Sequence, residues 1–365
     1  MESDLGAAST AAAAELIAFA RGLDVDDLDG NLETNEAREW IFGDALHSRP
    51  LPLNYGARGS YSEPDNPAIY LAVGTNDGML RMIRNTTGGG AESGEEVWAF
   101  MPRAAMAAQK VLRANGTGTK HPYTMDGSPV AFVQDVNRDG SIVASDGDRV
   151  YLYVGMRRGG KSYYALDITN PESPDLMWTL SKGGDFAEMG YTFSNPRVGL
   201  VRTGSGPRPA IMFAGGYDTN KDTRGAVGTD DAEGNAIYVV DAETGDLIWK
   251  AVGGSGSGSG TVFEHPDLVD SIPATLAVAD MDGDGYTDRI VVGDTGGNVW
   301  RADIGDASTS DWDLTLLASV GRHASGASGI TDDRRFFHRP DLVPSKDGTG
   351  LFDGVVIGSG NRADP

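Results

Sequence analysis

The chain has 365 residues and carries 53 Asp and Glu against 30 Lys and Arg, so its formal net charge is −23. This charge repels nucleic-acid phosphates and anionic lipid headgroups, which argues against nucleic-acid partners and membrane-surface binding. The absence of Cys from the sequence excludes disulfides, thiolate metal sites and thiol catalysis. An apolar content of 39% is enough for a large core in one repeat-built unit or two domains.

The first predicted element is a helix over residues 10–21, which are rich in Ala and have apolar residues three and four apart. It belongs to a helical and polar lead-in over residues 1–40. The longest apolar stretch, residues 11–20, contains Glu15 and is too short to cross a bilayer. The first residues are acidic where a secretory signal is basic, so we expect a cytoplasmic protein or a fragment of a longer exported one.

From about residue 41 the pattern changes to short β-branched and aromatic runs between Gly, Asp and Asn clusters. A short helix is expected at residues 103–112. The other runs form a loose repeat, in which an apolar strand ends in Val-Gly or Ile-Gly and a turn and second strand follow in most copies. Its copies begin with the strands at residues 69–74, 150–155, 290–293 and 355–358.

An all-β chain with such a repeat is typical of a β-propeller, whose radially arranged sheets leave only short edges. Trp98, Trp178 and Trp249 are expected in outer strands, as in the blades of quinoproteins. We therefore predict a modified β-propeller over residues 41–365, with two stacked sandwiches as the alternative. A Gly-Ser run at residues 253–260 is expected to be a flexible surface loop.

The strongest chemical signal is a loop between two apolar strands, with carboxylates at Asp280, Asp282, Asp284 and Asp288. Four such charges repel one another by roughly 3 kcal/mol per pair at short range, so a closed loop requires a cation. Calcium fits best because it accepts six to eight oxygens at flexible angles, and the Tyr286 carbonyl would add another ligand. The alternative is a solvated acidic turn.

A second loop matches the calcium-loop pattern at positions 1, 3, 5, 6 and 12. Its predicted ligands are Asp135, Asn137, Asp139, Ser141 and Asp146. The alternative is an ordinary Asx-rich turn. Residues 218–222 begin in the same way but have Thr223 where Gly is needed, so we expect only a polar loop there.

Other motifs do not predict catalysis. Residues 155–162 satisfy the P-loop pattern, but a strand-like segment follows where phosphate binding requires a helix, so a β-hairpin connection is expected. The five His are not spaced as zinc ligands on a helix, and there is no credible nucleophile elbow. We therefore predict no enzyme activity.

Several segments resemble the C-terminal domain of the PilY family of type IV pilus biogenesis factors and tip adhesins. The matching segments are residues 43–50, 73–80, 163–167, 215–218 and 280–300. The last is the most specific, because it joins the carboxylate loop to a Gly-Asp-Thr-Gly-Gly turn and a strand that ends in Trp300.

The resemblance implies a calcium-binding β-propeller at the pilus tip, with Asp280, Asp282, Asp284, Asp288 and the Tyr286 carbonyl around Ca²⁺. Calcium occupancy would regulate pilus extension against retraction, and with it twitching motility and adhesion. Expected partners are pilin or minor pilins and a host-cell or abiotic surface. The chain would be a fragment of a longer, exported cell-surface protein.

Two other functions remain open. A quinoprotein dehydrogenase also has Trp-rich blades and calcium, although such enzymes typically place adjacent Cys beside the quinone. A secreted carbohydrate-binding propeller with structural calcium is the second alternative.

Overall fold

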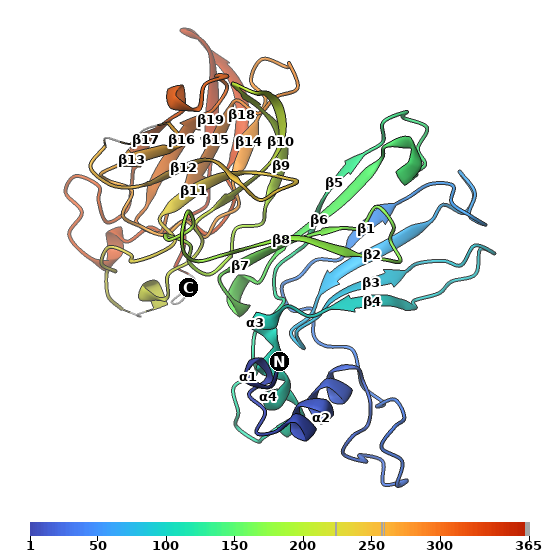
Figure 1. The fold of residues 1–365 in the computed structure, drawn as a ribbon. Coiled ribbons are helices and arrows are strands. Elements are labelled where there is room, and N and C mark those ends of the chain that lie inside the picture. Colours follow the sequence, from blue (N-terminus) through green and yellow to red (C-terminus); the bar gives the residue numbers. More distant parts are fainter. Residues whose placement is uncertain (223–224, 257, 259, 362–365) are drawn as a thin grey trace. The chain divides into compact units, whose positions relative to one another are not determined.

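Strands with buried apolar faces are the main regular secondary structure of the computed structural model, which describes residues 1–222, 225–256, 258 and 260–361 (Figure 1). Contacts group the chain into two units. One contains residues 1–152, 156–160 and 166–175, and the other contains residues 153–155, 161–165 and 176–365. The predicted boundary between residues 1–40 and 41–365 stays a prediction.

The first unit contains short helices: α1 (Glu2–Leu5), α2 (Thr10–Ala20), α3 (Arg103–Met106) and α4 (Ala108–Ala114). The Ser9 hydroxyl caps α2 by accepting a hydrogen bond from the Ala12 amide at 3.2 Å, and Leu5 and Leu16 are buried together. The helix predicted at residues 103–112 is divided at Ala107. Among the described residues, no helix has the length and apolar character needed to cross a bilayer.

The strands of the first repeats form four-stranded sheets. The antiparallel sheet β1-β2-β3-β4 consists of β1 (Leu51–Asn54), β2 (Ile69–Gly74), β3 (Leu80–Arg84) and β4 (Glu96–Phe100). The sheet β5-β6-β7-β8 consists of β5 (Val130–Gln134), β6 (Arg149–Gly155), β7 (Ser162–Asp167) and β8 (Asp175–Ser181). The strand after the P-loop-like string is therefore confirmed, and so is the hairpin connection.

The second unit contains a five-stranded sheet, a four-stranded sheet and a hairpin. The first has the order β13-β12-β11-β10-β9, from β9 (Arg197–Thr203), β10 (Gly206–Ala214), β11 (Ala236–Asp241), β12 (Leu247–Gly253) and β13 (Val262–His265). The second, β14-β15-β16-β17, consists of β14 (Ala277–Ala279), β15 (Arg289–Gly293), β16 (Asn298–Asp303) and β17 (Asp313–Ser319). The hairpin pairs β18 (Asp341–Asp347) with β19 (Gly350–Val356).

Strand β15 is buried on both faces, which explains its continuous apolar sequence. Ile290 and Val292 lie in a large core with Trp249, Trp300 and residues of β9–β12. The residue between them, Val291, packs instead with Val299 and Phe336 and with apolar residues of the β18–β19 hairpin. Because side chains alternate across a strand, one apolar run serves two cores.

The three Trp residues predicted in outer strands occupy different positions in their sheets. Trp98 and Trp178 lie in the outermost strands β4 and β8, as predicted. Trp249 lies in β12, which is not an outer strand because β13 pairs with it in parallel. In the predicted Gly-Ser loop, residues 257 and 259 lie outside the described residues.

Candidate functional site

The loop at residues 280–288 connects two paired strands, β14 and β15, whose last and first residues Ala279 and Arg289 face each other. One carboxylate oxygen of each of Asp280, Asp282 and Asp288 lies within 4.8 Å of the others. The sequence predicts that four carboxylates converge in this loop, and the structure brings three of them together where the strand pair closes the loop.

Backbone amides of the loop support the negative charge of Asp280. Its two carboxylate oxygens accept hydrogen bonds from the Gly283 amide at 2.7 Å and the Gly285 amide at 2.8 Å. Both glycines have φ in the left-handed region, at 81° and 92°, which L side chains rarely adopt. The Gly285 amide is the main cause of a lowered pKa at Asp280, so this carboxylate stays ionised over a wide pH range.

Asp284 lies apart from the three converging carboxylates. One of its oxygens forms an ion pair with Arg202 of β9, and the other accepts from the Tyr286 amide at 2.9 Å. The Arg202 guanidinium also lies 4.7 Å from the centre of the Tyr286 ring. Arg202 therefore already compensates the charge of Asp284, unlike that of Asp280.

The donor set at this loop suits a hard cation. Three carboxylates offer only oxygen, which is the ligand that Ca²⁺ and Mg²⁺ prefer, and the cluster contains no His or Cys that would favour zinc. The residues present thus fit the predicted calcium, with Asp280, Asp282 and Asp288 as the candidate ligands.

The loop at residues 135–148 repeats the backbone pattern of the loop at 280–288. Asp135 accepts from the Arg138 amide at 2.6 Å and the Gly140 amide at 2.9 Å, as Asp280 does from residues three and five positions on. Asn137 and Asp139 each accept from the amide two residues later, as Asp282 and Asp284 do. The two loops are therefore folded alike.

The equivalent of Asp288 in this second loop is Asp148, which sequence analysis missed. Asp148 is fully buried and accepts from the Val136 amide at 2.8 Å, just as Asp288 accepts from the Met281 amide at 2.7 Å. Asp146 instead lies 3.3 Å from the side-chain amide of Asn137. The signal that identifies this equivalence is a shared Asp-Arg dipeptide whose Arg begins the following strand, at 148–149 and 288–289.

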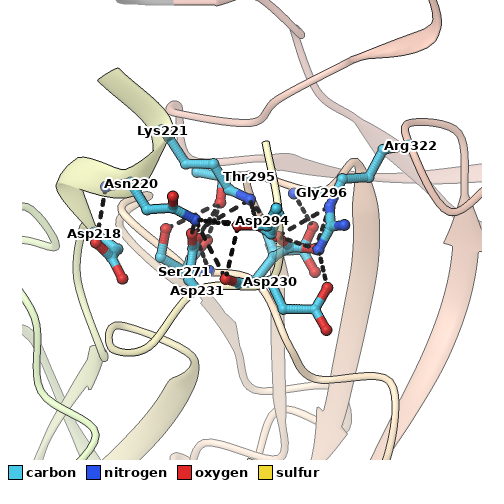
Figure 2. Close-up of polar contacts among 12 residues, drawn as sticks. Asp218, Asn220, Lys221, Asp230, Asp231, Ser271, Asp294, Thr295, Gly296 and Arg322 are labelled. Atoms are coloured by element: carbon cyan, nitrogen blue, oxygen red, sulfur yellow. Dashed lines mark hydrogen bonds and ion pairs between the residues drawn. The ribbon is translucent and has the colours of Figure 1, made fainter. Parts of the chain in front are cut away.

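A buried polar network in the second unit was also missed. Figure 2 shows Lys221 and Arg322 reaching the same group of acidic residues. The Lys221 ammonium is 2.6 Å from Asp270 and 3.3 Å from Asp231, with all three side chains fully buried. Arg322 binds both oxygens of Asp270, and His323 Nε2 lies 2.6 Å from one of them.

The positive charges of Lys221 and Arg322 keep Asp270 ionised although it is buried. Burial acts to raise the pKa of Asp270, but Lys221 and Arg322 outweigh it and hold this pKa below its usual range. Residues 218–222, predicted to be only a polar loop, thus supply the lysine of this network.

Asp294, in the Gly-Asp-Thr-Gly-Gly turn between β15 and β16, is wholly buried. One oxygen accepts from the Gly296 and Asn298 amides, and the other accepts from the Asn298 side chain and from the Trp300 indole at 2.8 Å. Burial, with a contribution from the charge of Asp270, raises the pKa of Asp294 to about 7. These contacts fix the conformation of the turn.

Comparison with known proteins decides the family. The PilY1 beta-propeller domain family matches residues 52–326, which is 275 of the 365 residues. The chain belongs to the PilY1 β-propeller family. The predicted resemblance and the all-β propeller fold are thereby confirmed.

Two PilY1 relatives show how much of those proteins this chain represents. The type IV pilus biogenesis factor PilY1 of Pseudomonas aeruginosa strain UCBPP-PA14 is 28% identical over 302 residues, covering 78% of this chain and 22% of that protein. A PilY1 homolog of Xylella fastidiosa is 28% identical over 310 residues, covering 76% of this chain and 18% of that protein. The chain thus spans about a fifth of these relatives.

The crystal structure of the Pseudomonas aeruginosa PilY1 C-terminal domain is similar to this chain with a TM-score of 0.52 and 25% identity. The match covers 80% of this chain and 52% of that one. It agrees with the expected likeness to the C-terminal domain of PilY proteins.

Two of the PilY-like segments meet in the first unit, around the buried carboxylate of Asp126. His47, from segment 43–50, places Nδ1 2.9 Å from Asp126, and Asn76, from segment 73–80, donates to it at 3.3 Å. Asn76 also donates to Asp44 at 2.8 Å, while Arg157 pairs with Asp126 at 3.1 Å. Segments 43–50 and 73–80 are therefore joined through the carboxylate of Asp126.

Proposed function

We propose that this chain is the calcium-binding β-propeller of a type IV pilus factor, located with the pilus tip outside the cell. Calcium at the Asp280 loop would regulate pilus extension against retraction, and through it twitching motility and adhesion. The single observation that carries the proposal is the convergence of Asp280, Asp282 and Asp288 within 4.8 Å. The role proposed is binding and regulation, not catalysis.

Electrostatics supports a bound cation. Two carboxylates about 5 Å apart repel each other by roughly 3 kcal/mol at an effective dielectric of about 20, and three such pairs are present in the cluster. A divalent ion would offset this repulsion. Calcium is favoured over magnesium because it tolerates irregular coordination, and this loop offers carboxylates of unequal exposure.

Asp280, Asp282 and Asp288 would hold the ion. Asp284 is the weaker candidate since Arg202 already compensates its charge, and the Tyr286 carbonyl completes the proposed set. An ion that binds only the folded loop stabilises that loop by mass action. The Thr287 amide donates to the Leu200 carbonyl at 2.8 Å, so the ordered loop would also stabilise the edge of β9.

The second loop is proposed as a weaker site for the same ion. Asp135, Asn137, Asp139 and the Ser141 backbone would hold it, together with Asp146 as predicted from the spacing or with Asp148 by equivalence to Asp288. Its similar hydrogen-bond pattern supports this. Asn137 stands where the Asp280 loop has Asp282, so the second loop has no negative charge at this position. This is why it is proposed as the weaker site.

Pilin or minor pilins are the proposed partners, with a host-cell or abiotic surface as the adhesion target. The support is that the relatives from Pseudomonas aeruginosa and Xylella fastidiosa are named type IV pilus biogenesis factors or homologs of one.

The test is to introduce Asp280→Asn into the full-length protein in its source organism. We expect fewer surface pili and a smaller twitching zone at an unchanged protein level. Asp311→Asn, at an exposed carboxylate outside the loop, is the matched control and should leave both unchanged. Normal piliation and twitching in an Asp280→Asn strain whose protein no longer binds calcium would refute the regulatory role.

A further inference from the structure

A cavity of about 420 Å³ lies in the second unit beside the Lys221 network, and none of its lining residues belongs to the Asp280 loop. The cavity is large enough for a small ligand, since ligand sites begin at roughly 300 Å³. Its polar lining residues are Asp230, Asp267, Asn298, Ser319 and His323, and its apolar ones are Pro266, Val269 and Leu316.

Within the residues that the structure describes, two buried polar atoms of this lining have no hydrogen-bond partner: Asn298 Oδ1 and Ser319 Oγ. Asn298 is only 1% exposed, and its Nδ2 already donates to Asp294 at 3.0 Å, so the free Oδ1 is an acceptor. Asn298 and Ser319 face each other across β16 and β17, which puts both side chains on the same face of the sheet. A buried acceptor without a donor is unfavourable, so a donor is expected at Asn298 Oδ1, and the Ser319 hydroxyl can either accept or donate beside it.

The remaining polar groups of the cavity are also acceptors. His323 Nε2 lies 2.6 Å from Asp270, so in the neutral ring this nitrogen carries the hydrogen and Nδ1 is left to accept. Asp230 and Asp267 provide carboxylates. Among the described residues that line the cavity there is no Lys or Arg.

The charge around the cavity favours a cation. Arg322 compensates part of Asp230, to which it donates at 2.6 Å, and its other bonds are to Asp270. Asp267 is largely exposed, and within the described part of the chain its ion-pair neighbour is His265 Nδ1 at 4.0 Å. A sugar is a poorer fit, because its hydroxyl groups both donate and accept while this site offers mostly acceptors.

We propose that this cavity binds a primary ammonium group carried on an aliphatic chain, either a free diamine or a lysine side chain of a partner protein. The ammonium provides three donors for Asn298 Oδ1, Ser319 Oγ and a carboxylate. Pro266, Val269 and Leu316 would contact the methylene chain, as apolar surfaces do for lysine stems. This site is independent of calcium at the Asp280 loop.

The test is isothermal titration of the chain with 1,5-diaminopentane and with Nα-acetyl-lysine methylamide, at about 150 mM salt so that distant charges are screened. We expect saturable binding of at least one compound at one site per chain. Binding of the diamine alone indicates a free ligand, and binding of the lysine derivative alone or more tightly indicates a protein partner. The Nε-acetylated lysine derivative should not bind.

Variants localise the binding. Ser319→Ala should weaken it by roughly three- to tenfold through loss of one hydrogen bond, and Asp267→Asn by roughly two- to fivefold because that carboxylate is exposed. Asp311→Asn removes the same charge away from the cavity and should have no such effect. No saturable binding of either amine by the wild type, or equal binding in Ser319→Ala, Asp267→Asn and Asp311→Asn, would overturn the proposal. Asp280→Asn should bind the amine normally, which separates this site from the calcium loop.

Discussion

The buried carboxyl group of Asp294 couples stability to pH. Its pKa in the folded chain is about 7, whereas an unfolded Asp has a pKa of about 3.9. Between these values the folded chain binds more protons than the unfolded chain, so the free energy of unfolding falls as pH rises. The stabilisation from this group is complete below about pH 4 and is lost as pH passes about 7.

Asp294→Asn should remove this pH dependence. The variant loses a carboxyl oxygen that accepts a hydrogen bond from the Trp300 indole, so we expect it to be less stable than the wild type by about 1–3 kcal/mol at pH near 5. The difference should shrink toward pH 8, because only the wild type pays for ionising the buried group. Urea denaturation across this range measures it, and a constant difference would contradict the raised pKa.

Lys221 compensates two buried carboxylates, so its loss should be costly. Lys221→Met leaves Asp231 without its ammonium partner and Asp270 with only Arg322 and His323, which should destabilise the chain by about 3 kcal/mol. Lys120→Met, at an exposed lysine, should stay within about 0.5 kcal/mol of the wild type. Equal unfolding midpoints in urea for the two variants would mean that the network is not stabilised by Lys221.

At the scale of elements, the turns between strands are the most constrained. Gly297, in the turn between β15 and β16, has φ 85°, and a Cβ there would lie 2.4 Å from the Gly321 Cα and 2.5 Å from the Arg334 carbonyl oxygen. Gly326 has nearly the same φ, 86°, but nothing within 4 Å of an added Cβ. Comparing substitutions at these two glycines therefore separates the cost of backbone strain from the cost of steric crowding.

Gly326→Ala should therefore cost only about 1 kcal/mol, from the left-handed backbone. Gly297→Ala should cost at least about 1–3 kcal/mol more, because backbone atoms must move to accept the methyl group. Chemical denaturation of both variants measures the difference. Similar losses in the two would show that crowding at Gly297 is relieved without cost.

The strands and the Asp280 loop could be predicted from sequence because their signals are local. Val-Gly endings and acidic spacing lie within a few residues, and the strands at 69–74 and 290–293 and the convergence of Asp280, Asp282 and Asp288 follow from them. The Lys221 network could not be predicted, because Asp270 is 49 residues from Lys221 and 52 from Arg322 in sequence, and only the packing of the second unit joins them. Trp249 was assigned to an outer strand since nothing local indicates the parallel pairing of β13.

At the scale of the whole molecule, the acidic charge and the site chemistry favour cations. A net charge of −23 attracts divalent ions and basic partner surfaces over several ångströms at physiological salt. The Asp280 loop, the Asp135 loop and the amine cavity all offer oxygen acceptors. On the proposals above, this chain would bind cations at several distinct places.

The central claim is that the Asp280 loop binds calcium, and calcium titration of this chain by calorimetry tests it most directly. The wild type should bind calcium saturably and more tightly than magnesium, and Asp280→Asn should lose the tighter site while Asp311→Asn keeps it. Retention of the wild-type stoichiometry and affinity by Asp280→Asn would contradict the account.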